Sequence, residues 1–340
     1  MSAPTSHPSG MSHPSLSQPA SVSIAAPAPS LRHQAELARF FPGRGPHWSD
    51  AAVMRTRRHI GGCISALEMA LCVGLDQYLP EKTGNLVSPG HCWRMIDAAP
   101  HLLSAELFAH FRMRAAFSLM TNVAGPLTDT GMPALAGEED EDVRSAIIGL
   151  SLAQARWSEV GAEDQPMRVD LPAEHMEELS WTVGGLLARM LLPMEIVPGM
   201  RLIGAIDDVV QQQLSTYDEQ TGPIARASLL ARSVHAQITM DRLEDLARSG
   251  QFLLLAGIIA ERTGLDTGVV AQAVVEHDDP AILVALCRVA GLSLQICGLT
   301  ALALRSVRGD YDDGQIAVLA DRFETMPHEE ADAFVSSLAV

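Results

Sequence analysis

Apolar side chains recur at helical spacing in the first half of the chain. The first stripe follows the order i, i+4, i+7, i+11 and i+15 and consists of Ile60, Ile64, Leu67, Leu71 and Leu75. A second stripe consists of Leu107, Phe111, Ala115 and Leu119. This spacing places the side chains of each stripe on one face of an α-helix, which then packs on a core. We therefore predict helices over residues 49–78 and 104–122.

Two more helices are predicted between residues 138 and 191. Negative charge is favourable beside the free amides of a helix start, so the acidic run 138–142 suits the first turn of a helix that extends to about residue 159. Asp170 is predicted to cap the next helix, with Pro172 in its first turn and an apolar stripe that ends at Leu191. The proline- and glycine-bounded segment 125–137 is predicted to be a loop.

The last third of the chain contains an internal repeat with an offset of 27 residues, which aligns 254–274 with 281–301. Each copy predicts a helix, a Gly-Leu turn and a capping residue, Asp266 or Ser293, that opens another helix. Helix pairs of this kind stack into solenoids. Strand-like alternation is missing and aromatic residues make up only 4%. The predicted fold class is all-α, a helical bundle that continues into α-solenoid-like (HEAT-like) helical hairpin repeats.

Composition divides the chain into three predicted regions. Residues 1–32 are rich in Ser, Pro and Ala, and so little apolar bulk cannot offset the entropy of ordering, which predicts a disordered tail. An N-terminal helical region is predicted over 33–130, and a C-terminal helical-repeat region over 138–340. The loop between them is the predicted boundary.

Charge and cysteine content indicate the compartment and exclude some partners. A net charge of −17 argues against nucleic acid, whose binders concentrate positive charge. The apolar runs are too short or too interrupted to predict a membrane span, and the first charged residue is Arg32, which does not suit a secretory signal. We expect a cytoplasmic protein in which the five widely spaced cysteines are reduced and buried.

Motifs of common catalytic sites are missing. Lys82 is the only lysine and follows Glu81, where a phosphate-binding P-loop requires glycine. The segment 328–332 has the wrong spacing for a helical zinc site, and the acidic run 310–314 lacks the glycine position of a calcium loop, so helix capping explains it better. We predict no catalytic, cofactor or metal residues and favour a role other than catalysis.

The sequence nevertheless offers candidate residues for a pocket between helices, namely Glu68, His91, His101 and Arg112. Helical bundles build ligand sites by drawing polar groups from segments that are remote in sequence. The alternative for Glu68 is a structural ion pair with Arg55 or Arg58, and the alternative for the histidines is a helix cap or a solvated surface. The arginines of 54–59 also suit contact with an acidic partner or with lipid headgroups.

A candidate interaction surface is the acidic run itself, which consists of Glu138, Glu139, Asp140, Glu141 and Asp142. A second acidic surplus lies in residues 310–340. Such faces either keep a protein solvated or dock a basic partner.

Three stretches resemble a bacterial, mostly alphaproteobacterial family known as domain of unknown function 2336. They are the Phe-Phe-Pro of 40–42, the Asp-Leu-Pro-Ala-Glu of 170–174 and the Leu-Cys-Arg-Val-Ala-Gly-Leu-Ser of 286–293. The resemblance implies a helical, repeat-containing bacterial protein without an established activity, so it carries over no site residue.

Two functions are compatible with these observations. The first is a non-catalytic protein-protein interaction or regulatory module, whose partner is another protein or a second copy of the chain. The second is a small-molecule sensor, or an enzyme of unfamiliar type, with a pocket between helices.

Overall fold

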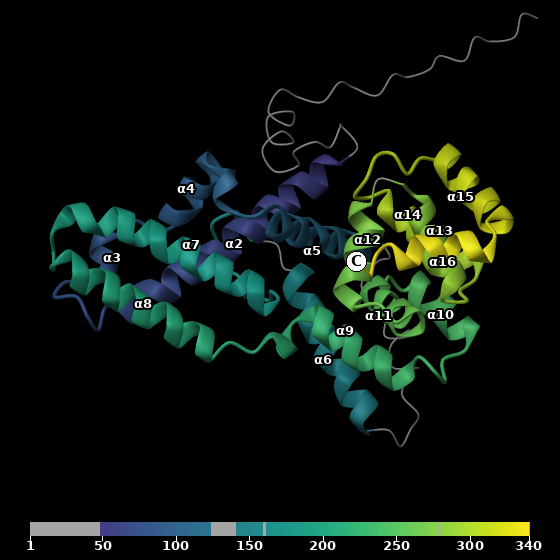
Figure 1. Cartoon of the computed structure of the whole chain (residues 1–340), viewed down its shortest axis with the longest axis horizontal. Helices are drawn as coiled ribbons and strands as arrows, with labels where there is room; N and C mark the ends of the chain where they lie inside the picture. The colour runs from purple at the N-terminus through teal and green to yellow at the C-terminus, as the bar shows by residue number, and fades with distance from the viewer. Residues whose placement is uncertain (1–47, 124–140, 159–160, 278, 340) are drawn as a thin grey trace, which may run out of the picture.

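The computed structural model describes residues 48–123, 141–158, 161–277 and 279–339. Over these residues the chain forms α-helices, short 3-10 turns and one isolated bridge between Trp48 and Arg308. Figure 1 shows α7 and α8 side by side at one end and helices α10 to α16 gathered at the other. The all-α prediction is therefore confirmed for the described residues.

The first helices are α2 (Asp50–Leu75), α3 (Thr83–Leu86), α4 (His91–Ala98), α5 (Ala105–Val123), α6 (Glu141–Ser158), α7 (Ala173–Leu191) and α8 (Gly199–Ser215). The remaining ones are α9 (Pro223–Val234), α10 (Met240–Arg248), α11 (Phe252–Thr263), α12 (Thr267–Glu276), α13 (Ala281–Val289), α14 (Leu294–Leu304), α15 (Asp313–Thr325) and α16 (His328–Ser336). Short 3-10 segments are η1 (Pro100–Leu102), η3 (Leu192–Met194) and η4 (Glu219–Thr221).

Helix α2 organises the N-terminal half. It begins after Ser49, whose hydroxyl accepts a hydrogen bond from the amide of Ala52, and its predicted apolar stripe is buried. It packs against α3, α4, α5, α7 and α8. The stripe therefore does what its spacing predicts, although the helix ends at Leu75, three residues before the predicted end at Tyr78.

The predicted cap of α7 is wrong. The helix begins at Ala173, and Pro172 occupies the cap position without a side-chain hydrogen bond. Asp170 is instead buried, with its carboxylate held by Arg156 at 3.2 Å and by Arg168 at 3.3 Å. A buried carboxylate is more stable beside guanidinium groups than at a solvated helix start, so the ion pairs decide its position.

The two segments aligned by the sequence offset form the helix pairs α11–α12 and α13–α14. Gly264 and Gly291 adopt the left-handed conformation at the end of the first helix of each hairpin, with φ of 74° and 65°. Asp266 and Ser293 then cap the second helices through their side-chain oxygens. The predicted helices, turns and caps are present in both segments, whereas their arrangement as a repeat and as a solenoid stays a prediction.

Buried apolar side chains form one continuous cluster between Trp48 and Val335. Helix α5 joins the two halves, because it packs against α2 and α6 as well as α11, α12 and α14. Arg112 of α5 and Glu276 of α12 form a buried ion pair at 2.7 Å within this junction. The two regions thus share a core over the described residues, and the boundaries assigned from composition stay a prediction.

One described helix, Asp50–Leu75, is long and apolar enough to cross a membrane when judged by length and composition. In the structure 61% of its most apolar window is buried inside the protein, as in a core helix. The predicted tail, the loop 125–137 and residues 138–140 of the acidic run lie outside the described residues.

Candidate functional site

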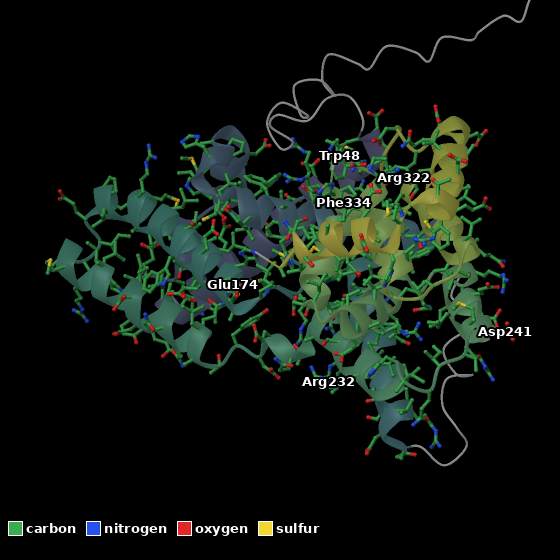
Figure 2. All side chains as sticks on the ribbon, turned by 45° about the vertical axis from the view of Figure 1, so that its right-hand side comes forward. Trp48, Glu174, Arg232, Asp241, Arg322 and Phe334 are labelled. Atoms are coloured by element: carbon green, nitrogen blue, oxygen red, sulfur yellow. The ribbon has the colours of Figure 1, made fainter. Side chains whose placement is uncertain are left out.

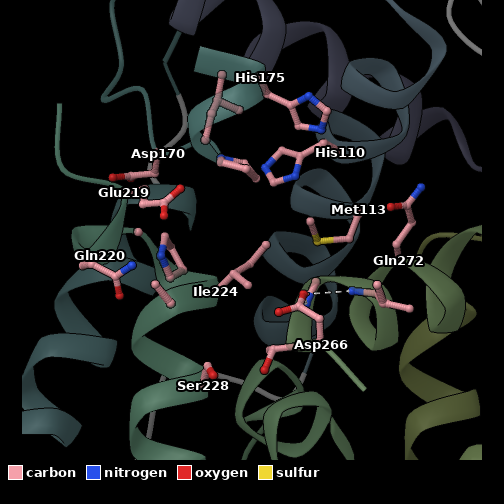
Figure 3. Close-up of a pocket in the computed structure, with 18 of the residues that line it drawn as sticks. His110, Met113, Asp170, His175, Glu219, Gln220, Ile224, Ser228, Asp266 and Gln272 are labelled. Atoms are coloured by element: carbon pink, nitrogen blue, oxygen red, sulfur yellow. Dashed lines mark hydrogen bonds between the residues drawn. The ribbon is translucent and has the colours of Figure 1, made fainter. Parts of the chain in front are cut away.

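A cavity of about 540 Å³ lies where α5, α7, α9 and α12 meet. Figure 3 shows the imidazoles of His110 and His175 on one side of it, Glu219 and Gln220 on another, and Asp266 at the α12 end. Two further rim residues, Glu174 of α7 and Arg232 of α9, are labelled in Figure 2. The volume falls within the range of roughly 300–1,000 Å³ found for small-molecule sites.

An imidazole pair forms one wall of the cavity. His110 of α5 and His175 of α7 contact edge to face, with ring centroids 5.4 Å apart and planes at 62°. His110 is 5% exposed, and burial, assisted by the nearby His175 and Arg114, lowers the pKa of His110 to about 3. The ring is therefore neutral at pH 7, and within the part of the chain that the structure describes its Nε2 atom has no hydrogen-bond partner.

Trp157 of α6 contributes a second buried polar group to the cavity lining. Its indole nitrogen is buried and has no hydrogen-bond partner in the described residues. An indole N–H can only donate, and a buried donor without an acceptor costs about 1–3 kcal/mol. A polar ligand that accepts a hydrogen bond here would recover that free energy.

Three helices, α7, α9 and α12, begin at the cavity. Helix α12 is capped by Asp266, whose carboxylate accepts from the amides of Gly268 and Val269. Helix α9 begins at Pro223 without any side-chain cap, and Ile224 and Ala225 of its first turn line the cavity. Exposed first-turn amides and the helix dipole favour acceptor groups at such a position.

The wall between α7 and η4 is held by specific hydrogen bonds. The carboxylate of Glu219 accepts from the amide of Ala173 at 2.9 Å. The hydroxyl of Tyr217 accepts from the amide of Leu171 at 2.8 Å and donates to the carbonyl of the same residue at 2.5 Å. Burial raises the pKa of Tyr217 to about 12, so this hydroxyl stays protonated and keeps donating at neutral pH. The segment that precedes α7 is thereby fixed against η4.

The predicted pocket residues fall at separate places. Glu68 is buried, and its carboxylate accepts from the amides of Gly90 at 2.8 Å, His91 at 3.3 Å and Cys92 at 2.6 Å. It therefore caps the start of α4, and the predicted pairing with Arg55 or Arg58 is wrong. The free amides of a helix start satisfy a buried carboxylate as guanidinium groups would.

The other two predicted pocket residues, His101 and Arg112, lie away from Glu68 and His91. His101 lies exposed in η1, and Arg112 forms the buried ion pair with Glu276. None of the four predicted pocket residues lines the cavity described above. Within the described part of the chain, no group of three or more His, Cys, Asp or Glu side chains is arranged to hold a metal ion.

Of the predicted interaction surface, Glu141 and Asp142 are described. Both are exposed in the first turn of α6, and Glu141 forms an ion pair with Arg144. Their position at a helix start agrees with the expected interaction of carboxylates with the helix dipole.

Sequence reasoning missed His110, His175 and Trp157 as cavity residues. Each lies on a largely apolar helix, where a lone polar aromatic residue reads as part of the core. The two histidines belong to helices far apart in the chain, and no periodicity of the sequence predicts that they contact each other. Only the packing of α5 against the start of α7 brings them together.

A family model described as an uncharacterised protein conserved in bacteria, DUF2336, matches residues 151–336. The match covers more than half of the chain. The chain belongs to the DUF2336 family. The resemblance inferred from 170–174 and 286–293 is confirmed, because both stretches lie within the matched residues.

The DUF2336 match includes α7 to α16 and therefore most of the cavity lining. His110 and Met113, contributed by α5, lie outside it. Searches of curated proteins and of solved structures each found no match. The family carries no assigned activity, so any function has to be argued from the site.

Proposed function

We propose that this DUF2336 protein is a non-catalytic regulatory module that binds a small polar molecule in the cavity between α5, α7, α9 and α12. The observation that carries the proposal is the buried lining: His110 Nε2 and the Trp157 indole nitrogen find no hydrogen-bond partner among the described residues, and both residues line a cavity of about 540 Å³. A ligand that hydrogen-bonds both groups would remove a desolvation cost that the free protein carries.

The position of the cavity supports a regulatory role. Its lining comes from α5, which belongs to the N-terminal half, and from α9 and α12, which belong to the C-terminal half. A ligand that contacts elements of both halves would change their relative stability only through contacts that differ between the bound and free states. Such differing contacts would couple occupancy of the cavity to the arrangement of the two halves.

Filling the cavity is expected to abolish ligand binding. Ser228 of α9 lines the cavity and is partly buried, whereas Ser233 lies exposed on the same helix outside the lining. In a thermal-shift screen against polar metabolites, a ligand at one hundred times its Kd should stabilise the wild type by about 2.7 kcal/mol. Ser228→Trp should remove this stabilisation, and the matched control Ser233→Trp should retain it.

An equal response of the two variants to every ligand would contradict this function. If every stabilising metabolite acts with the same strength on Ser228→Trp and on Ser233→Trp, the ligand binds elsewhere. The cavity would then be a packing feature of the fold.

Protein recognition is a second candidate, favoured by exposed carboxylates at the C-terminal end. We define the acidic face as Asp321 and Glu324 of α15 with Glu329 and Asp332 of α16, all exposed. A basic partner would bind such a face with a strong salt dependence, since exposed charges are screened within about 10 Å at 0.1 M salt.

Neutralising the acidic face tests this second function. Tagged full-length protein is expected to retain a basic partner at low salt and to lose it when the four carboxylates, together with residues 138–142, are changed to amides. Changing the exposed pair Asp207 and Asp208 of α8 provides the control. Retention of the partner by the neutralised protein would refute an electrostatic docking surface.

A further inference from the structure

A second cavity, separate from the one described above, lies between α2 and the segment 161–168 and has a volume of about 360 Å³. Its basic side chains are Arg55, Arg58, His59 and Arg168, of which Arg168 also pairs with Asp170 at 3.3 Å, and no carboxylate contributes to the lining among the described residues. We call it the arginine cavity. Such a concentration of positive charge is unusual in a chain whose net charge is −17.

The positions on α2 explain how the charges converge. Arg55, Arg58 and His59 are spaced i, i+3 and i+4, which places them on one face of the helix. The facing segment is held close, because the amide of Met167 donates to the carbonyl of Gly62 at 3.0 Å. A side-chain carbon at Gly61 would lie 2.1 Å from the carbonyl oxygen of Glu163, so only glycine permits this approach. The cavity walls are therefore fixed by backbone contacts.

The arginines of α2 differ in whether they form ion pairs with carboxylates. Arg57, on another face of the same helix, contacts Asp97 at 3.1 Å and Glu163 at 2.9 Å. Arg55 is buried and donates only to neutral groups, the hydroxyl of Ser118 at 3.0 Å and the carbonyl of Ser158 at 3.3 Å. Its charge is hydrogen-bonded but not compensated by a carboxylate in the described structure.

Arg58 and His59 have fewer hydrogen-bond partners than Arg55 among the described residues. The Nε of Arg58 is buried and has no hydrogen-bond partner among the described residues, and the ring of His59 has only a backbone group of Trp157 nearby as a weak partner there. His59 is 1% exposed, and burial, followed by the charges of Arg114 and Arg55, holds the pKa of His59 well below its usual value. A neutral imidazole still supplies one N–H donor.

The same region contains a further buried cation. Arg114 is 0% exposed, and its guanidinium contacts the Cys63 sulfur, the carbonyl of Arg168 and the face of Trp157. None of these groups carries a negative charge. Burying an uncompensated cation is costly, and the cost falls when a desolvated anion sits beside it.

We propose that the arginine cavity binds the phosphoryl group of a small molecule. Guanidinium groups present planar pairs of N–H donors that match phosphate oxygens, and a dianion compensates more of the accumulated charge than a single carboxylate does. The volume leaves room for an organic group attached to the phosphate. The ligand is therefore a phosphate monoester, either free in solution or as a lipid headgroup.

Inorganic phosphate is the first probe, applied to the full-length chain at constant ionic strength against chloride. Isothermal titration is expected to detect binding to the wild type. Arg58→Gln should weaken phosphate affinity on the order of tenfold or more, the loss typical of one hydrogen bond to a charged group. The control Arg201→Gln, on the exposed face of α8, should leave affinity within about twofold.

Thermal unfolding provides a second measurement, in which Arg58→Gln is expected to increase stability although it weakens phosphate binding. Without phosphate, Arg58→Gln should unfold at a higher temperature than the wild type, because it removes a cation that pairs with no carboxylate of the described residues. Phosphate also stabilises proteins generally by exclusion from their surface. The diagnostic quantity is therefore the phosphate-dependent increase, which should be smaller in Arg58→Gln than in Arg201→Gln.

Vesicle sedimentation distinguishes the two sources of the phosphoryl group. Binding to phosphatidylcholine vesicles that contain phosphatidate, displaced by inorganic phosphate and lost in Arg58→Gln, would assign the site to a lipid headgroup. Phosphate binding without sedimentation would assign it to a soluble ester. Equal phosphate affinity of the two variants, or no detectable binding to the wild type, would overturn the proposal.

Discussion

Replacing Arg112 with methionine while Glu276 remains is expected to lower the free energy of unfolding by about 3–5 kcal/mol. The guanidinium donates to both carboxylate oxygens, at 2.8 and 2.7 Å, and the two side chains are only 9% and 8% exposed. The substitution removes the guanidinium that neutralises this buried carboxylate. Urea denaturation followed by circular dichroism measures the loss.

The double variant Arg112→Met with Glu276→Met should regain most of that stability, since neither charge is then buried. The control is the exposed pair of Arg305 and Asp313, whose side chains are 52% and 87% exposed. Arg305→Met should change the free energy of unfolding by less than about 1 kcal/mol. If Arg112→Met is as mild as Arg305→Met, the pair does not join the two halves as described.

Adding one methyl group at Gly61 is expected to destabilise the protein by about 1–3 kcal/mol, although alanine is the better helix former. The added carbon would meet the backbone carbonyl of Glu163, which cannot move without displacing the 161–168 segment. Hydrogen exchange at the amide of Met167, which bonds to Gly62, should accelerate together with the loss of stability.

Gly185 provides the matched substitution. It lies exposed inside α7, and nothing stands within 4 Å of the position that a side-chain carbon would take. Gly185→Ala should therefore stabilise the protein by about 0.5–1 kcal/mol. Equal effects of the two substitutions on denaturation midpoints would show that the close approach at Gly61 is not a constraint.

Sequence patterns predicted the helices and turns that depend on residues close together in the chain. The stripe from Ile60 to Leu75 formed the buried face of α2, and the predicted caps Asp266 and Ser293 opened the helices that follow them. Capping and helical periodicity involve residues within a few positions of one another, so the chain itself records them. The Gly-Leu turns of the repeat were predicted for the same reason.

Contacts between remote segments could not be predicted in this way. Glu68 finds its partners in amides 22 to 24 positions away. The two cavities depend on the way α2, α5 and α9 approach segments that carry no matching pattern. The arginines of 54–59 were visible in the sequence as positive charge, but the sequence could not tell which were paired. Only the ion pairs of Arg57 separate it from Arg55 and Arg58.

The central claim, that this protein binds a small molecule between α5, α7, α9 and α12, is tested most directly by native mass spectrometry of the chain purified from bacterial cells. We expect a discrete mass increment of metabolite size on the wild type and on Ser233→Trp, and none on Ser228→Trp. Identical spectra for all three proteins, with or without an increment, would contradict the claim.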